Sequence, residues 1–138
     1  MELVKTAVDP QRAPLAAPAA PAEPSAHLVL ADIVRGAPGA RAAVLVSADG
    51  FAVASTGSAD PTANAAMAAA ALGLGRQLAT SAGGQDLRQL VIDHDGGLIF
   101  VWPVGDRRAV CVFADNDVDQ RGLRRLVRVH GARLMESA

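Results

Sequence analysis

The longest apolar stretch of the chain, residues 62–82, contains a single charged side chain, Arg76. Its larger apolar side chains recur at helical spacing and predict a stripe that packs against a sheet: Met67, Ala71, Leu74 and Leu78. The rest of its surface is apolar as well. Because a helix that is apolar on more than one side is not stable half in water, we expect a second structure to cover the other side.

The other side of this helix is made mostly of small residues: Ala65, Ala69, Leu72, Gly73, Arg76 and Thr80. Gly73 and Gly75 each lower helix stability by roughly 1 kcal/mol relative to alanine, and close approach of another helix backbone would account for them. Since the sequence shows one helix of this kind, we expect its partner to be the same helix of a second copy, in a symmetric dimer. The alternative is an alanine-rich helix whose small side is exposed to solvent.

The residues before this helix predict a shorter helix and a two-stranded hairpin. Ser25 is suited to cap a helix over residues 25–36, which ends in glycine and is followed by a proline. Two apolar runs, 42–47 and 51–55, are joined by an Asp-Gly pair at 49–50. Such a pair favours a hairpin turn because glycine readily adopts a positive φ.

The central helix has clear ends, and three strands follow it. Asp60 and Pro61 suit its cap and its first turn, and a Gly-Gly pair at 83–84 ends it. Strands with glycine-containing turns between them are predicted over 87–93, 98–104 and 108–114. The last two are apolar at almost every position, so each needs cover on both faces, and we expect helices on both sides of the sheet.

A last helix follows an acidic cluster at residues 115–119. The cluster is similar to the start of a calcium loop, but Gln120 stands at the glycine position and Leu126 at the glutamate position, so helix capping is the preferred interpretation. One side of this helix is apolar, and the other carries Arg121, Arg124, Arg125 and Arg128. A solvated basic face is the default interpretation, and an acidic partner surface or a nucleic-acid phosphate track are the alternatives.

Residues 1–25 have a different composition from the rest of the chain. Five prolines lie there, separated mainly by alanine. This composition favours extended conformers and supplies no apolar face for a core, so we expect a disordered tail or tether in front of a domain over 26–138. A PxxP ligand within the tail is the alternative.

The overall composition narrows the class of protein. With 51% hydrophobic residues, 20% charged residues and a net charge of -1, the chain has no global attraction to nucleic acid or to an anionic membrane. The N-terminus lacks a basic start followed by an apolar segment, and no apolar span of about eighteen residues is free of charges and turn signals, so we expect a cytoplasmic protein. Cys111, the one cysteine, lies in an apolar run and is interpreted as a small buried residue.

Candidate catalytic chemistry is sparse. His94 lies between Asp93 and Asp95, and an imidazole beside a carboxylate can transfer protons, but no nucleophile is placed with it, so turn polarity is the preferred interpretation. The sequence contains no GxGxxG, GxxxxGK(S/T), HExxH or paired CxxC motif. The sequence therefore predicts no catalytic residues, no metal and no cofactor.

The order of elements resembles the Roadblock/dynein light-chain family, and in particular its short bacterial members of the MglB type. The resemblance covers about residues 26–136 and depends on the whole order: the Asp-Gly hairpin, the alanine-rich central helix, the Gly-Gly hairpin with the run that follows it, and the last helix. It implies an α+β fold, α-β-β-α-β-β-β-α, in which a five-stranded antiparallel sheet carries the central helix on one face and the two terminal helices on the other.

The resemblance also implies an assembly and a partner. Family members dimerise through the third strand and the central helix, which adds Leu90, Val91 and Ile92 to the expected dimer interface. The paired central helices would form a platform for a partner, with Arg76 and Thr80 on it, and the partners of the family are Ras-like small GTPases. Members that stimulate hydrolysis donate no obvious arginine finger, so Arg76 is not expected to be catalytic.

The leading hypothesis is therefore a non-enzymatic, homodimeric regulator or adaptor of a Ras-like small GTPase. A scaffold subunit in a histidine-kinase-linked signalling complex is one alternative. A nucleic-acid-binding protein that uses the arginine face of the last helix is a second. An enzyme that uses His94 with a neighbouring aspartate is a third.

Overall fold

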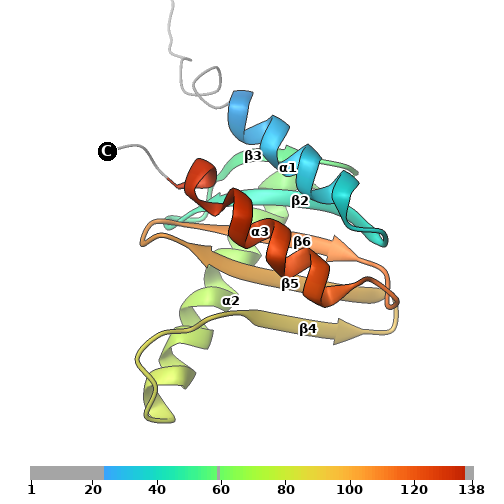
Figure 1. Cartoon of the computed structure of the whole chain (residues 1–138). Helices are drawn as coiled ribbons and strands as arrows, with labels where there is room; N and C mark the ends of the chain where they lie inside the picture. Colours follow the sequence, from blue (N-terminus) through green and yellow to red (C-terminus); the bar gives the residue numbers. More distant parts are fainter. Residues whose placement is uncertain (1–23, 59, 136–138) are drawn as a thin grey trace, which may run out of the picture.

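A computed structural model of the chain describes residues 24–58 and 60–135. Five strands form one antiparallel sheet in the order β3-β2-β6-β5-β4, and three helices cover it (Figure 1). The elements are α1 (Pro24–Gly36), β2 (Ala40–Ser47), β3 (Ala52–Thr56), α2 (Pro61–Ser81), β4 (Leu90–His94), β5 (Gly97–Val104), β6 (Arg108–Ala114) and α3 (Gln120–Leu134). Most of the predicted tail, residues 1–23, lies outside the described residues.

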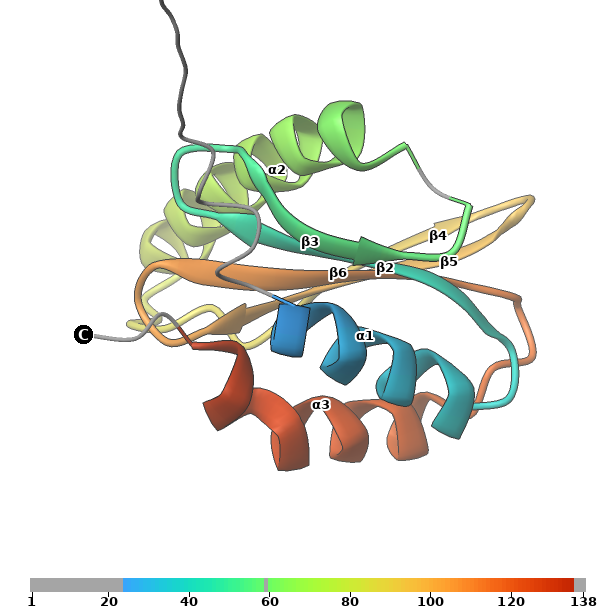
Figure 2. The ribbon, with the colours of Figure 1, turned by 90° about the horizontal axis from the view of Figure 1, so that it is seen from above.

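The helices lie on both sides of the sheet, as the sequence predicts. Figure 2 shows α2 on one face and α1 with α3 on the other. The expected fold class, α+β with a five-stranded antiparallel sheet, is confirmed. β4 and β3 are the edge strands, so among the described elements each pairs through one side only.

The two apolar faces of β5 and β6 account for this layered arrangement. Alternate residues of β5 point to opposite faces, so Phe100 and Trp102 join the core beneath α1 and α3, while Val101 joins the core beneath α2. In β6, Val112 faces the first core and Cys111 the second. Because each strand buries both sets of side chains, neither face of this part of the sheet can be left in water.

Local signals at the first hairpin and at the starts of α2 and α3 are found where the sequence places them, whereas α1 begins at Pro24, so Ser25 lies inside that helix and is not its cap. Asp60 Oδ1 accepts hydrogen bonds from the backbone of Thr62 and Ala63 at the start of α2, and Asp119 Oδ1 accepts one from Gly122 at the start of α3. Gly50 has a φ of +91°, in the turn that the Asp-Gly pair predicts. The acidic cluster thus caps a helix. Among the described residues, no group of three or more His, Cys, Asp or Glu could hold a metal.

One predicted strand is shorter in the structure. Residues 87–93 were expected to be extended throughout, whereas β4 begins only at Leu90, which pairs with Val101. The reason lies in Leu87, whose Cδ2 lies 3.0 Å from the Cβ position that a side chain at Gly75 would have. Leu87 therefore packs against α2 as the chain approaches the sheet, before the hydrogen-bonded ladder starts.

Within the described ranges, none of the helices combines the length and the apolar character needed to cross a membrane.

Cys111 offers a test of the core beneath α2. Burial raises the pKa of its thiol to about 12, so the folded chain holds it as the neutral, unreactive thiol at pH 8. We expect a thiol reagent to label the native protein only as fast as the core opens, and to label the protein at once in denaturant. Rapid labelling of the native protein at pH 8 would contradict this burial.

Candidate interaction surface

The central helix α2 has one buried side and one exposed side, and they are the reverse of those predicted. The residues that face the sheet are small or medium in size: Ala65, Ala68, Leu72 and Gly75. The large residues of the predicted sheet-facing stripe point away from it, with exposed fractions of 61% for Met67, 61% for Leu74 and 64% for Leu78. The prediction that these three contact the sheet is therefore wrong.

The physical reason is the close approach of α2 to the strands. The buried residues of α2 pack against Val44, Val46, Val101, Ala109 and Cys111, which are themselves mostly short. At Gly75 an added Cβ would lie 3.0 Å from Leu87, so a larger residue there would force a neighbour to move. A helix that packs this closely presents its small side to the sheet, and its large residues remain outside.

Because the buried side of α2 is not the predicted one, only some of the α2 residues expected at a dimer interface are exposed. Ala65 and Leu72 are covered by the sheet of their own chain, so they are not available to a second copy. Ala69 is half-buried beside the same core. Gly73 is exposed, and a Cβ added to it would meet nothing within 4 Å in the chain. The close backbone contact that would have explained Gly73 is thus not made within the chain.

The second half of α2 extends past the sheet. After Gly75 none of its residues is buried, and in Figure 1 this end projects beyond the strands. Leu74 and Leu78 lie on this half, one turn apart on the same side. These two exposed leucines, at the end of a helix that continues outside its own core, leave an apolar patch of the kind that protein interfaces cover.

The edge strand β4 adds to this apolar surface. Cross-strand neighbours share a face of the sheet, so Ile92, opposite Ile99, points to the side of α2, and Val91, opposite Phe100, points to the side of α3. Their exposed fractions are 42% and 38%, while Leu90 is half-buried in the core beneath α2. These three residues, which the family resemblance adds to the expected dimer interface, therefore lie on an edge strand of the sheet.

Arg76 and Thr80 lie on another side of α2, away from the exposed stripe. Arg76 lines a small hollow of about 110 Å³ that also involves Leu72 and Gly73 of α2, together with Ser47 at the end of β2 and Asp106 in the turn between β5 and β6. Thr80, one turn further along, is exposed. Both residues are accessible, as the platform prediction requires, but they do not share a face with Met67, Leu74 and Leu78.

His94 is the last residue of β4, directly before the turn into β5. Its Nδ1 accepts a hydrogen bond of 3.1 Å from the backbone N–H of Gly96, and its side chain is exposed. This contact matches the interpretation of His94 as a polar turn residue. The ring nitrogen therefore holds the turn between β4 and β5, where it accepts this hydrogen bond.

A family comparison identifies the domain that carries this surface. The model of the Roadblock/LC7 domain matches residues 26–114, which is more than half of the chain. The chain belongs to the Roadblock/LC7 family. Among curated proteins, none matches its sequence significantly.

Solved structures share the fold of this Roadblock chain. A Roadblock/LC7 domain from Streptomyces avermitilis is 29% identical with a TM-score of 0.70, and the match covers 80% of this chain and 98% of that one. MglB from Myxococcus xanthus is 19% identical with a TM-score of 0.73, over 80% and 92% of the two chains. An MglB with a tetrameric arrangement is 17% identical with a TM-score of 0.72, over 80% and 85%. At these low identities, the similarity to the two MglB structures is a similarity of fold alone.

The two glycines of α2 provide a test of which side of the Roadblock helix is covered. Gly73→Ala adds a methyl group in open space, so we expect it to stabilise the chain by about 0.5–1 kcal/mol through helix propensity. Gly75→Ala places its methyl group against Leu87, and we expect a loss of about 1 kcal/mol. Chemical denaturation of the two variants measures both effects. Destabilisation by Gly73→Ala would instead indicate a close contact at this position in the assembly.

Proposed function

We propose that this Roadblock chain is a non-enzymatic, homodimeric regulator or adaptor of a Ras-like small GTPase. The observation that carries the proposal is the combination of family membership with an apolar helix that has two usable sides. One side supplies an exposed stripe for a second copy, and another presents accessible polar residues to a partner.

The dimer in this proposal uses the exposed stripe of α2 and the free edge of β4. Pairing of β4 with the β4 of a second copy would satisfy backbone groups that an edge strand leaves open, and it would join two five-stranded sheets into one. The same two-fold arrangement would cover Met67, Leu74 and Leu78. A related MglB fold is found in a tetrameric arrangement, which supports association between copies.

The dimer is tested by placing charges on the stripe. In Leu74→Glu/Leu78→Glu, four carboxylates would enter the contact between two copies, and we expect the dissociation constant of the dimer to rise about a hundredfold or more. Sedimentation velocity over a concentration series measures it. Val129→Glu is the matched control, because Val129 is also a large exposed residue, at 67%, but lies on α3. A double variant that dimerises like the wild type would contradict this interface.

The partner site in this proposal is the side of α2 that carries Arg76 and Thr80. A switch region of a small GTPase is ordered by the γ-phosphate and released after hydrolysis, so its contacts with a fixed surface differ between the two nucleotide states. A protein discriminates between those states only through such differing contacts. The exposed guanidinium of Arg76, beside a shallow hollow, is suited to a carboxylate or a backbone carbonyl of a switch segment.

The function is tested by binding to Ras-like GTPases of the same organism, each loaded with GDP or with a non-hydrolysable GTP analogue. We expect calorimetry to show binding at least about tenfold tighter for one nucleotide state, and Arg76→Ala to weaken it. Thr62→Ala, at the far end of α2, is the control. Equal affinity for the two states would make the chain a constitutive scaffold. No binding in either state would favour the histidine-kinase-linked alternative.

A further inference from the structure

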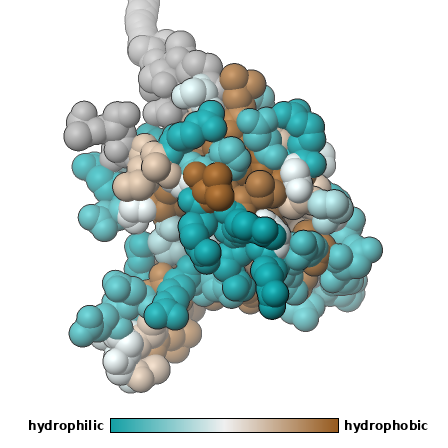
Figure 3. All heavy atoms as spheres, viewed as in Figure 1, coloured by the Kyte–Doolittle hydropathy of each residue, from teal (hydrophilic) through white to brown (hydrophobic). Residues whose placement is uncertain are grey.

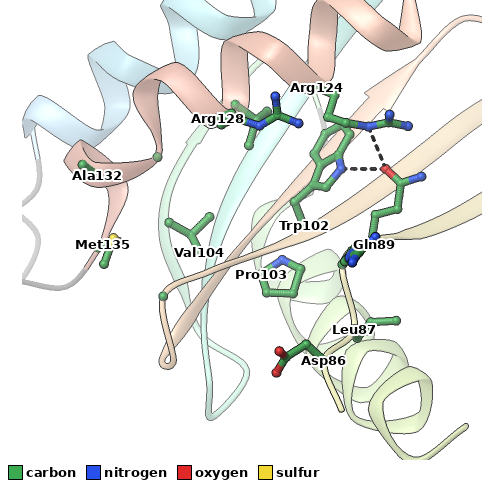
Figure 4. A pocket seen from close by; sticks show the side chains of 14 residues that line it. Asp86, Leu87, Gln89, Trp102, Pro103, Val104, Arg124, Arg128, Ala132 and Met135 are labelled. Atoms are coloured by element: carbon green, nitrogen blue, oxygen red, sulfur yellow. Dashed lines mark hydrogen bonds between the residues drawn. The ribbon is translucent and has the colours of Figure 1, made fainter. Parts of the chain in front are cut away.

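A second surface lies on the opposite face of the sheet from α2. A groove of about 1060 Å³ runs between α3, the end of β5 and residues 86–89, which lead into β4 (Figure 4). It exists because α1 contacts β2 and β3 while α3 contacts β5, so no helix on this face lies over β4. The volume is at or above the upper end of the range of about 300–1,000 Å³ that is usual for small-molecule sites, and it is suited to a segment of chain.

Hydrogen bonds join three side chains at the floor of the groove. Trp102 is 6% exposed, and its Nε1 donates to Gln89 Oε1 at 3.0 Å. Arg124 Nε donates to the same oxygen at 3.2 Å, so α3 and the segment before β4 are joined across the groove (Figure 4). The remaining lining is largely apolar and includes Val104, Val127 and Met135.

The walls of the groove carry an excess of positive charge. Arg88, Arg124 and Arg128 line it, against one carboxylate, that of Asp86. Within residues 24–58 and 60–135, no ion pair joins any of these arginines to a carboxylate. Arg124 and Arg128 are one helical turn apart on α3 and project over Trp102, and Figure 3 shows hydrophilic residues gathered over this helix. An apolar floor beside guanidinium groups that form no ion pair among the described residues is complementary to a ligand that is both apolar and anionic.

We propose that this groove binds an acidic linear segment of a partner protein, with an aliphatic side chain on the apolar floor and carboxylates on Arg124 and Arg128. Guanidinium groups pair with carboxylates in a directional, two-pronged geometry. Side chains one helical turn apart are separated by about 5–6 Å, which matches carboxylates two residues apart in an extended segment, at about 3.3 Å per residue. The proposal goes beyond the GTPase hypothesis and does not depend on it.

A protein segment suits the groove better than a nucleic acid does. Single-stranded nucleic acids bind arginine-rich grooves that also offer exposed aromatic rings for base stacking. The aromatic side chain that lines this groove, Trp102, is only 6% exposed, and its N–H already donates a hydrogen bond to Gln89. The chain as a whole has a net charge of -1, so the positive charge is local to this face.

Selection from a random twelve-residue peptide library against the full chain tests the proposal. We expect enriched peptides to carry two or more acidic residues beside an aliphatic one. Synthetic copies without tryptophan are then titrated while the emission of Trp102 is followed, because it is the one tryptophan of the sequence and lines the groove. Binding in the groove should change that emission in proportion to occupancy.

Charge-reversal variants separate the groove from the rest of the helix. Arg124→Glu/Arg128→Glu should weaken binding about tenfold or more, whereas Arg121→Glu/Arg125→Glu should leave it nearly unchanged. The second pair is the matched control, since it makes the same change in net charge on exposed residues of α3 that do not line the groove. Thermal unfolding checks both variants. If the first pair does not fold, Arg128→Gln replaces it, because it leaves the bond between Arg124 and Gln89 intact.

Three results would overturn the proposal. One is a selection without enrichment of acidic residues. Another is equal loss of binding in the two charge-reversal pairs, which would indicate nonspecific attraction to the helix. The third is that neither the wild type nor the groove variant binds acidic peptides, while the groove variant binds a single-stranded oligonucleotide more weakly than the wild type does. That result would assign the groove to nucleic acid instead.

Discussion

The close packing of α2 on the sheet is the contact on which the outer surface of the chain depends. Ala65, Ala68 and Gly75 let the helix lie near the strands, and Leu87 packs into the space that Gly75 leaves. A helix with small residues beneath it must carry its large residues outside. The exposed stripe of Met67, Leu74 and Leu78 is therefore a direct consequence of how the core beneath α2 is filled.

Uneven cover of the sheet is the second consequence of this architecture. On one face, α1 and α3 lie over β3, β2 and β5, and on the other α2 lies mainly over β2 and β3. β4 is an edge strand that no helix covers well, and its side chains Val91 and Ile92 are partly exposed. Both surfaces proposed for interaction, the stripe with its edge strand and the groove beneath α3, lie where this cover is incomplete.

The two surfaces differ in chemistry, and this difference separates their roles. The stripe of α2 is apolar and continues a helix that projects beyond its own core, which suits a lasting contact between copies. The groove combines a buried tryptophan with guanidinium groups that lack carboxylate partners among the described residues, which suits an acidic segment that binds and dissociates. The helices that carry them, α2 and α3, lie on opposite faces of the sheet (Figure 2).

The sequence by itself determined the order of elements, their caps and the two-sided sheet, because these follow from local signals. An Asp-Gly pair, the caps Asp60 and Asp119, and the unbroken apolar character of β5 and β6 each act over a few residues. Tertiary structure alone decided which side of α2 meets the sheet. Helical periodicity specifies the angles between residues but not the rotation of the whole helix, and with both sides apolar, the fit of small residues against the strands selected one. The groove likewise depends on Arg124, Gln89 and Trp102 coming together from separate segments, and no local pattern predicts that.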